Sequence, residues 1–375
     1  MDLSCLPFDL VLEIIVRSPS KSIAKFRCVS RQWCRVLSDP KFLHANYIAG
    51  GVIKKPIFIN SPYRFQNLGV CSMDITKHID DIGIQRRIRT DMVGEGLIYD
   101  MQVYGVCRGL LLVKGLFQGN FSTYVWNPTT GNFLGVNQRP LTDSTPIVEE
   151  YIRKFYGLGY VPIVKEYFYM EVYDNIYDGT GIIERYSFRN GEWSTINTNI
   201  FCRYMDPDFT VSNGWLGLYF GEALYWVVLS FISHSFVILA YQCSSGEAEE
   251  IVLPSECDFE SVEVCSLVIL HELISFCAIF DNVERSSYYV VKIWSMKENG
   301  GQCYWTQYVT LHTSHYGSGY MLPVCSTDFG VVYVNNTNGM MLRKNNIERI
   351  LEHKIFEIIE VPHYMYIYEE SLMWL

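Results

Sequence analysis

Hydrophobic positions near the start of the chain recur at the spacing of short amphipathic helices. The apolar residues of the first such segment are Leu10, Val11, Ile14 and Ile15. Pro19 ends this segment, because proline breaks the hydrogen-bond pattern of a continuing helix. A second short helix is expected to carry Ile23, Phe26 and Cys28. The pattern predicts helices across residues 9–48.

Capping signals mark where two further helices begin. Ser30 is a suitable N-cap for a helix that presents Trp33 and Leu37, and Asp39 precedes a proline at the first position of the next helix. A glycine pair at residues 50–51 is expected to end the helical part of the chain.

From Lys55 onward, short runs of Ile, Val, Tyr, Phe and Trp alternate with Gly, Asn-Pro, Asn-Gly and Asp-Gly turns. This pattern is typical of successive antiparallel strands. The runs form a degenerate repeat whose units open near Tyr104, Phe155, Gly214, Val262 and Leu322. Repeats of about fifty residues indicate the blades of a β-propeller.

A chain of repeated sheets must protect its terminal edge strands, and closing the ring does so. The segments Pro56–Asn60 and Leu68–Ile75 can share one blade with Tyr364–Leu375, which gives about six blades. We therefore expect an α + all-β protein. Residues 1–47 form a small helical domain, and residues 52–375 form an antiparallel β-propeller-like domain.

The stretch Ala223–Gly246 contains no Asp, Glu, Lys or Arg across 24 residues, which is long enough to span a bilayer. Ser230, Ser233 and His234 interrupt it, β-branched and aromatic residues dominate it, and no basic cluster flanks it. We interpret it as two buried strands around a polar turn and expect no association with membranes.

Charge is unevenly distributed over the 375 residues, whose formal net charge is −10. Residues 1–50 carry about +3 and the remainder about −13. An acidic body argues against binding of nucleic-acid phosphates. We interpret the short basic run from Arg86 to Arg89 as a solvated loop.

Sequence signals for location and redox state agree. The N-terminus begins Met1-Asp2-Leu3-Ser4 and lacks the basic, apolar and cleavage regions of a secretory signal. We expect a cytoplasmic or nuclear location, or both. The twelve cysteines are then expected to be thiols, mainly small buried apolar residues, and none forms a C-x-x-C pair.

Motifs for catalysis are missing from the sequence, which contains no G-x-S-x-G elbow, no phosphate loop of the G-x-x-x-x-G-K-[ST] type and no H-E-x-x-H metal helix. The pair His312 and His315 has no apparent third ligand, and we interpret its segment as a surface loop. We expect a binding protein that has neither a metal nor a cofactor and is not an enzyme.

The N-terminal helices resemble the F-box. The matching pieces, in order, are Leu6-Pro7, an apolar first helix, Pro19-Ser20-Lys21-Ser22, Phe26-Arg27-Cys28-Val29-Ser30 with Trp33, and Pro40-Lys41-Phe42. This resemblance implies docking of a Skp-type adaptor, which links to a cullin, a RING subunit and a ubiquitin-charged conjugating enzyme. By position, the expected adaptor-binding residues are Leu6, Pro7, Ile14, Ile15, Cys28, Val29 and Trp33.

Helices this short also need apolar residues for packing against one another. Ile14 and Trp33 fit internal packing and docking equally well, whereas the pairs at residues 6–7 and 28–29 fit docking better. Ser18 departs from the usual apolar residue of the F-box at the end of the first helix, which predicts weaker docking.

The β region resembles the kelch-like F-box-associated domains of large plant F-box families. The matching motifs are Val106-Cys107-Arg108-Gly109-Leu110-Leu111, Tyr124-Val125-Trp126-Asn127-Pro128-Thr129-Thr130-Gly131 and Tyr368-Glu369-Glu370-Ser371-Leu372. The motifs are of a structural kind and identify no ligand.

Together the two resemblances imply the substrate-recognition subunit of an SCF-type ubiquitin ligase, which presents a protein substrate for ubiquitination. The alternative is a propeller that binds a small molecule or a glycan, with the F-box serving another association.

Overall fold

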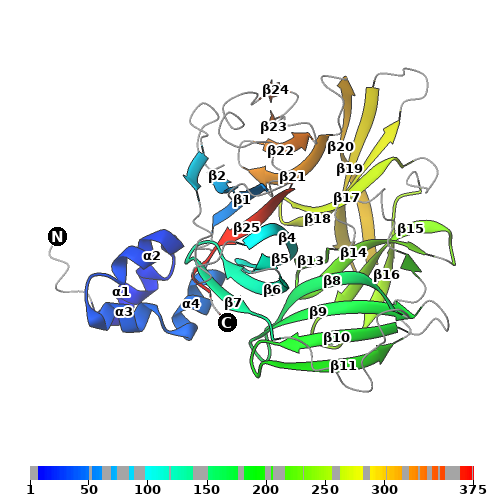
Figure 1. The fold of residues 1–375 in the computed structure, drawn as a ribbon. Helices are drawn as coiled ribbons and strands as arrows, with labels where there is room; N and C mark the ends of the chain where they lie inside the picture. Colours follow the sequence, from blue (N-terminus) through cyan, green and yellow to red (C-terminus); the bar gives the residue numbers. More distant parts are fainter. Residues whose placement is uncertain are drawn as a thin grey trace.

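The structure is a computed structural model of the 375-residue chain. It describes residues 7–49, 53–60, 69–73, 84–87, 98–117, 120–137, 151–175, 181–198, 204–205, 216–230, 232–255, 262–281, 288–300, 302–314, 321–327, 330–335, 340–344, 347–350, 364–373 and 375. Figure 1 shows a group of helices beside a larger domain of strands.

The helical module consists of α1 (Phe8–Ile15), α2 (Ser20–Phe26), α3 (Arg31–Leu37) and α4 (Pro40–Ile48). Both predicted caps are confirmed. The side chain of Ser30 accepts a hydrogen bond from the Trp33 backbone N–H at 3.2 Å, and the Asp39 side chain accepts one from the Lys41 N–H at 2.8 Å. The glycine pair at residues 50–51 lies outside the described residues.

The prediction that Cys28 belongs to the second helix is wrong. Helix α2 ends at Phe26, and the backbone N–H groups of Cys28 and Val29 donate to the carbonyls three residues before them. This tighter winding forms a turn, in which residues 28 and 29 are exposed.

In the described residues, the strands form six four-stranded units. Numbered in chain order, the first three blades are β4 (Ile98–Cys107), β5 (Leu110–Phe117), β6 (Asn120–Asn127) and β7 (Asn132–Gly135); β8 (Tyr151–Val161), β9 (Glu166–Asn175), β10 (Gly181–Ser187) and β11 (Glu192–Thr198); and β13 (Leu218–Phe220), β14 (Ala223–Ser230), β15 (Ser235–Gln242) and β16 (Ala248–Val252), with β12 (Tyr204–Met205) paired to β14.

The remaining blades are β17 (Val264–Leu270), β18 (Leu273–Asp281), β19 (Tyr288–Asn299) and β20 (Gln302–Ser314); β21 (Met321–Thr327), β22 (Gly330–Asn335), β23 (Met340–Lys344) and β24 (Ile347–Ile350); and β25 (Tyr364–Glu370) with β1 (Ile53–Asn60), β2 (Gly69–Met73) and β3 (Ile84–Arg87).

The blades close into a ring through their inner strands. Strand β4 contacts β8 and β25, β8 contacts β13 and β14, and the ring continues from β14 through β17 and β21 back to β25. The predicted repeat openings fall within or a few residues before the first strand of each blade. The architecture is a six-bladed β-propeller, as the sequence predicted (Figure 1).

The predicted closing blade is confirmed. Strand β25 pairs antiparallel with β1 from Ile53 opposite Glu370 to Ile59 opposite Tyr364, and β1 pairs with β2. The last strand of the chain therefore joins the first one, so the two ends of the propeller are held by hydrogen bonds rather than by a linker.

The apolar stretch from Ala223 is the hairpin of β14 and β15, in register from Ala223 opposite Gln242 to Ser230 opposite Ser235. Both strands are largely buried, which explains their lack of charge. No helix in the described part of the chain combines the length and apolar character needed to cross a bilayer.

Two predicted loops are strands instead. Arg86 and Arg87 belong to β3, and His312 belongs to β20, opposite Val290. Both β3 and β20 are the outermost strands of their blades. An outermost strand faces solvent and carries polar side chains, so its sequence resembles that of a loop. His315 lies outside the described residues.

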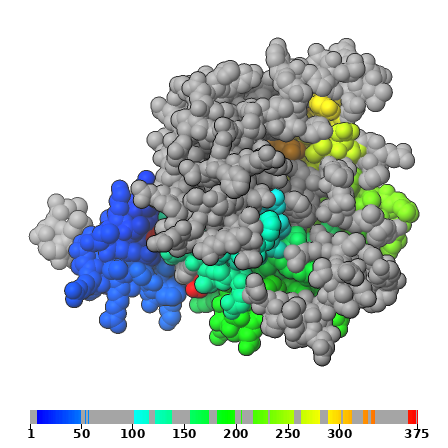
Figure 2. All heavy atoms as spheres, viewed as in Figure 1, coloured from blue at the N-terminus to red at the C-terminus, as the bar shows by residue number. Residues whose placement is uncertain are grey.

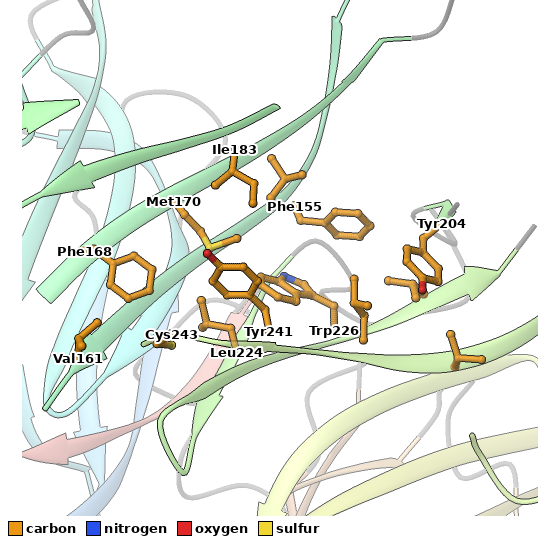
Figure 3. Close-up of a cluster of buried hydrophobic side chains, with 14 residues drawn as sticks. Phe155, Val161, Phe168, Met170, Ile183, Tyr204, Leu224, Trp226, Tyr241 and Cys243 are labelled. Carbon is orange, nitrogen blue, oxygen red and sulfur yellow. The ribbon is translucent and has the colours of Figure 1, made fainter. Parts of the chain in front are cut away.

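Apolar cores fill the spaces between neighbouring blades. Between the second and third blades, Phe155, Met170 and Ile183 face Leu224 and Trp226 (Figure 3). All five are almost fully buried. Such close packing fixes each blade against the next, so the ring behaves as one body.

The cysteines that the structure shows to be buried are Cys107, Cys243, Cys265, Cys277 and Cys325. Burial raises the pKa of the Cys243 and Cys325 thiols to about 12, so both stay protonated and unreactive. Cys28, Cys34 and Cys303 are exposed.

Candidate functional site

Several large apolar side chains of the helical module are exposed to solvent. The large apolar residues exposed on it are Phe8, Leu10, Ile14, Phe26, Val29 and Ile48. Figure 2 shows the module as a lobe that stands out from the strand domain. We call these six residues together with Pro7 and Cys28, which are also exposed, the apolar face. Exposed apolar surface of this kind makes the module a candidate protein-binding site.

The structure separates the predicted docking residues into two groups. Pro7, Ile14, Cys28 and Val29 are exposed, with Ile14 at 62% and Val29 at 68% of full exposure. Ile15 and Trp33 are half-buried and pack against the core of the module, and Leu6 lies outside the described residues.

Ile14 and Trp33, which the sequence left undecided, thus take different positions. Ile14 points to solvent, whereas the Trp33 ring packs against Phe8 with ring centroids 5.4 Å apart. Trp33 therefore holds Phe8 of the apolar face in position and is itself only partly exposed. Phe8, Leu10 and Phe26 belong to the apolar face although they were not among the predicted docking residues. The spacing of Leu10 and Ile14 on one side of α1 was the available signal.

Ser18 is half-buried just beyond the end of α1. Its backbone carbonyl accepts a hydrogen bond from the Asn46 side chain at 3.0 Å, and the same amide donates to the Val16 carbonyl at 2.6 Å. Asn46 is buried in α4, so the end of α1 is tied to α4 by the backbone. The effect of Ser18 on docking stays a prediction.

A second site lies where α4 meets the propeller, and it begins with the chain's C-terminal residues. Leu372 follows β25 and is 5% exposed. It packs with Ile23 of α2 and Leu37 of α3, which are fully buried. One of the three buried residues at the centre of the helical core is therefore supplied by the end of the propeller.

Asn127 holds this C-terminal segment in place. Its side-chain amide donates to the carbonyls of Ser371 at 3.0 Å and Met373 at 2.7 Å. Its side-chain oxygen accepts from the backbone N–H groups of Thr129 and Thr130, which shapes the turn after β6. Asn127 is fully buried, so both sets of bonds are shielded from water.

Gly109 allows the same segment to approach closely. Arg108 and Gly109 form the turn between β4 and β5, both with positive φ, 49° and 83°. A Cβ atom at Gly109 would lie 2.5 Å from the Ser371 Cβ and 2.7 Å from the Glu369 carbonyl oxygen. Only glycine fits this position.

Arg108 links the turn to α4. Its guanidinium lies over the rings of Tyr47, at 4.1 Å, and Tyr160, at 4.0 Å, and it donates to His44 Nδ1 at 3.1 Å. That bond requires an unprotonated Nδ1. Burial, Arg108 and Lys165 lower the pKa of His44, which agrees with a neutral imidazole.

Glu369 forms a further contact between the two domains. The Tyr47 hydroxyl donates to its carboxylate at 2.6 Å. Burial raises the pKa of Glu369, and Tyr47, Lys54 and Arg108 oppose that rise. Burial and the nearby carboxylate raise the pKa of Tyr47, so its hydroxyl stays protonated and donates.

These contacts bring the three motifs of the β region to one place. We call this place the junction and define it by Tyr47, Arg108, Gly109, Asn127, Glu369, Ser371 and Leu372. The sequence indicated that the motifs are structural, but not that they meet at α4. Within the parts of the chain that the structure describes, no group of three or more His, Cys, Asp or Glu side chains is arranged to hold a metal ion.

Comparison with known families agrees with the fold. A family described as the F-box domain matches residues 3–45, and one described as the F-box associated beta propeller domain matches residues 64–371. This chain belongs to the F-box-associated propeller family. Its domain combination is that of an F-box substrate-recognition protein, and proteins of this type are generally non-catalytic adaptors.

Relatives of this chain occur in Arabidopsis thaliana. An F-box/kelch-repeat protein is 24% identical over 344 residues, which cover 90% of this chain and 87% of the relative. A putative F-box protein is 54% identical over 41 residues, which cover 11% of each chain.

Solved structures resemble the chain more distantly. A chain of the nidogen/laminin complex covers 85% of this chain and all of its own length, at 9% identity and a TM-score of 0.42. TolB from Acinetobacter baumannii has a TM-score of 0.37 at 10% identity and covers 81% of this chain and 66% of its own. These scores are too low to support an inference about this chain.

Proposed function

We propose that this F-box protein is the substrate-recognition subunit of an SCF-type ubiquitin ligase. The observation that carries the proposal is the apolar face of the F-box, exposed beside a propeller with its own closed core. The face docks a Skp-type adaptor and, through it, a cullin and a RING subunit. The propeller holds a protein substrate.

In this role the protein catalyses no bond chemistry. It holds the substrate near a ubiquitin-charged conjugating enzyme, which raises the effective concentration of the substrate's lysines. Such a subunit works in the cytoplasm, the nucleus or both.

Adaptor docking is tested by replacing Val29 with aspartate in the full chain. Val29 is 68% exposed, so the substitution leaves the F-box core intact. In the complex it would bury an unpaired carboxylate, and the affinity for a purified Skp-type adaptor should fall at least about tenfold. Titration calorimetry measures the change. Combining Val29→Asp with Pro7→Ala should abolish capture of the adaptor.

Val252→Asp is the matched control, because Val252 is 73% exposed but lies on β16 of the propeller. It should bind the adaptor like the wild type. Equal affinity for Val29→Asp and the wild type would contradict docking through the apolar face.

Substrate delivery needs a separate test. Proximity labelling with and without proteasome inhibition should reveal proteins whose labelling by the wild type rises on inhibition. Their labelling by the Val29→Asp, Pro7→Ala double variant, which still holds the substrate but does not deliver it, should not depend on the inhibitor. If no labelled protein shows this difference between the two chains, degradation is not the outcome of this protein's binding.

A further inference from the structure

The end of the chain connects the closing strand of the propeller directly to the F-box core. Strand β25 pairs with β1 along its full length, from Tyr364 to Glu370. Ser371, Leu372 and Met373 follow without an intervening loop and are all buried. The position of this tail, residues 371–373, is therefore fixed by the strand that closes the ring.

The F-box core depends on this tail. Four short helices cannot bury a large core of their own. The central apolar cluster of the module contains only three buried residues, and one of them, Leu372, comes from the tail. Without it, Ile23 and Leu37 would face a cavity or water, and α2 and α3 would lose a shared contact.

The propeller also holds the tail independently of the helices. Asn127 donates to the carbonyls of Ser371 and Met373, and the Ser371 hydroxyl accepts from the Met373 N–H at 3.0 Å. Met373 packs into the core between the first and second blades, with Leu110 and Tyr160. The tail can occupy this track only when β25 is in the ring.

We propose that closure of the propeller and completion of the F-box core are one event, so that the apolar face acquires its folded form only in a chain whose propeller is closed. The first half of this proposal concerns folding alone. The consequence for adaptor docking rests on the proposed function.

Hydrogen exchange followed by mass spectrometry on the full chain tests the coupling. Asn127→Asp keeps the side-chain oxygen that shapes its turn but replaces the two donations to the tail with repulsion between oxygens. Exchange in α2 and α3, which Asn127 does not touch, should become faster by about tenfold or more. The strands β14 and β15 serve as the distant reference.

Asn190→Asp is the matched control. Asn190 occupies the equivalent turn of the second blade, and its side-chain oxygen accepts from the Glu192 N–H at 3.1 Å. It is exposed, and its hydrogen bonds are to Ser187 and Glu192 rather than to the tail, so its replacement should leave α2 and α3 unchanged.

Leu372→Ala separates coupling from general unfolding, because it keeps every hydrogen bond of the tail. It should speed exchange in α2 and α3 by roughly 30-fold or more, as expected for a cavity in a small core, while β14 and β15 keep their protection. Unchanged exchange in α2 and α3 would overturn the proposal, whatever the result for Asn127→Asp.

Coupling must also act in the reverse direction. Ile23→Ala loosens the F-box core from within and should speed exchange in β25. If β25 keeps its protection while α2 and α3 lose theirs, the propeller closes independently and the two events are separate. None of these measurements uses the adaptor. Failed adaptor binding with intact coupling would therefore count against the proposed function alone.

Discussion

Glu369 shows how a single carboxyl makes the junction sensitive to pH. It accepts from Tyr47 of α4, and Lys54 of β1, Arg108 of the first blade and Glu272 of the fourth also act on it. Burial dominates and raises its pKa above the ordinary value of 4.5. The folded state therefore holds the proton to higher pH than the unfolded state does.

Replacement of Glu369 by glutamine should flatten the pH dependence of stability. In the wild type, the contribution of this group is fully present below about pH 4.5 and is lost as pH rises through the raised pKa, because desolvation disfavours the charged carboxylate. Glutamine cannot ionise and can still accept from Tyr47. Urea unfolding at several pH values between 4 and 8 should show a smaller decline for Glu369→Gln. A decline equal to that of the wild type would contradict the assignment.

Individual residues differ in how far the sequence could place them. The caps Ser30 and Asp39 were predicted because a cap bonds to a backbone group two or three residues away. The role of Leu372 was not, since its partner Ile23 lies at the other end of the chain and no local pattern relates the two. The sequence could not decide between core and surface for Ile14, because short helices need apolar residues both for packing and for docking.

Neighbouring blades are joined by a device that recurs in their outermost strands. The indole of Trp193 in β11 donates to the Asn137 carbonyl after the first blade, at 2.9 Å. The indole of Trp305 in β20 donates to the Val252 carbonyl of the third blade, at 2.8 Å. Each tryptophan therefore connects its blade to the preceding one.

Trp305→Phe should weaken this connection. The phenyl ring retains part of the packing against Phe276, but the donation to Val252 is lost. We expect a loss of about 1 kcal/mol in the free energy of unfolding, the usual value for one such bond. Urea midpoints measure it. Tyr304→Phe removes only the hydroxyl of an exposed neighbouring ring. Its free energy of unfolding should stay within roughly 0.5 kcal/mol of the wild-type value. Equal losses for the two variants would exclude a specific role for the indole.

The sequence predicted the strands inside each blade better than the outermost strand of each blade. Inner strands such as β14 are apolar and end at recognisable turns. Outermost strands such as β11 and β16 expose most of their residues. Their polar sequences lack the apolar alternation of a half-buried strand, which is why the basic run of β3 and the histidine of β20 were interpreted as loops.

The ring as a whole depends on its last strand. Removing residues 364–375 would leave Ile53–Ile59 of β1 without their inner partner. An unpaired strand edge invites association with other chains. We expect the truncated protein to form species larger than the 43.5 kDa chain, as measured by size-exclusion chromatography with light scattering.

Leu372→Ala separates loss of the ring from loss of the tail contact. It keeps β25 and should elute as the wild type does. If the truncated protein also elutes as the wild type does, closure by β25 is not what protects the edge of β1.

The six-bladed ring itself could be predicted from repeat spacing, whereas the position of the helices against it could not, because that position depends on contacts between residues far apart in the sequence.

The tail also bears on how the protein is made. A ribosome releases the F-box helices first and Leu372 more than 300 residues later. At roughly 5–20 residues per second, tens of seconds separate the two. Through this interval the nascent F-box lacks a central part of its core. A prematurely terminated product should therefore bind the adaptor more weakly than chains that contain Leu372.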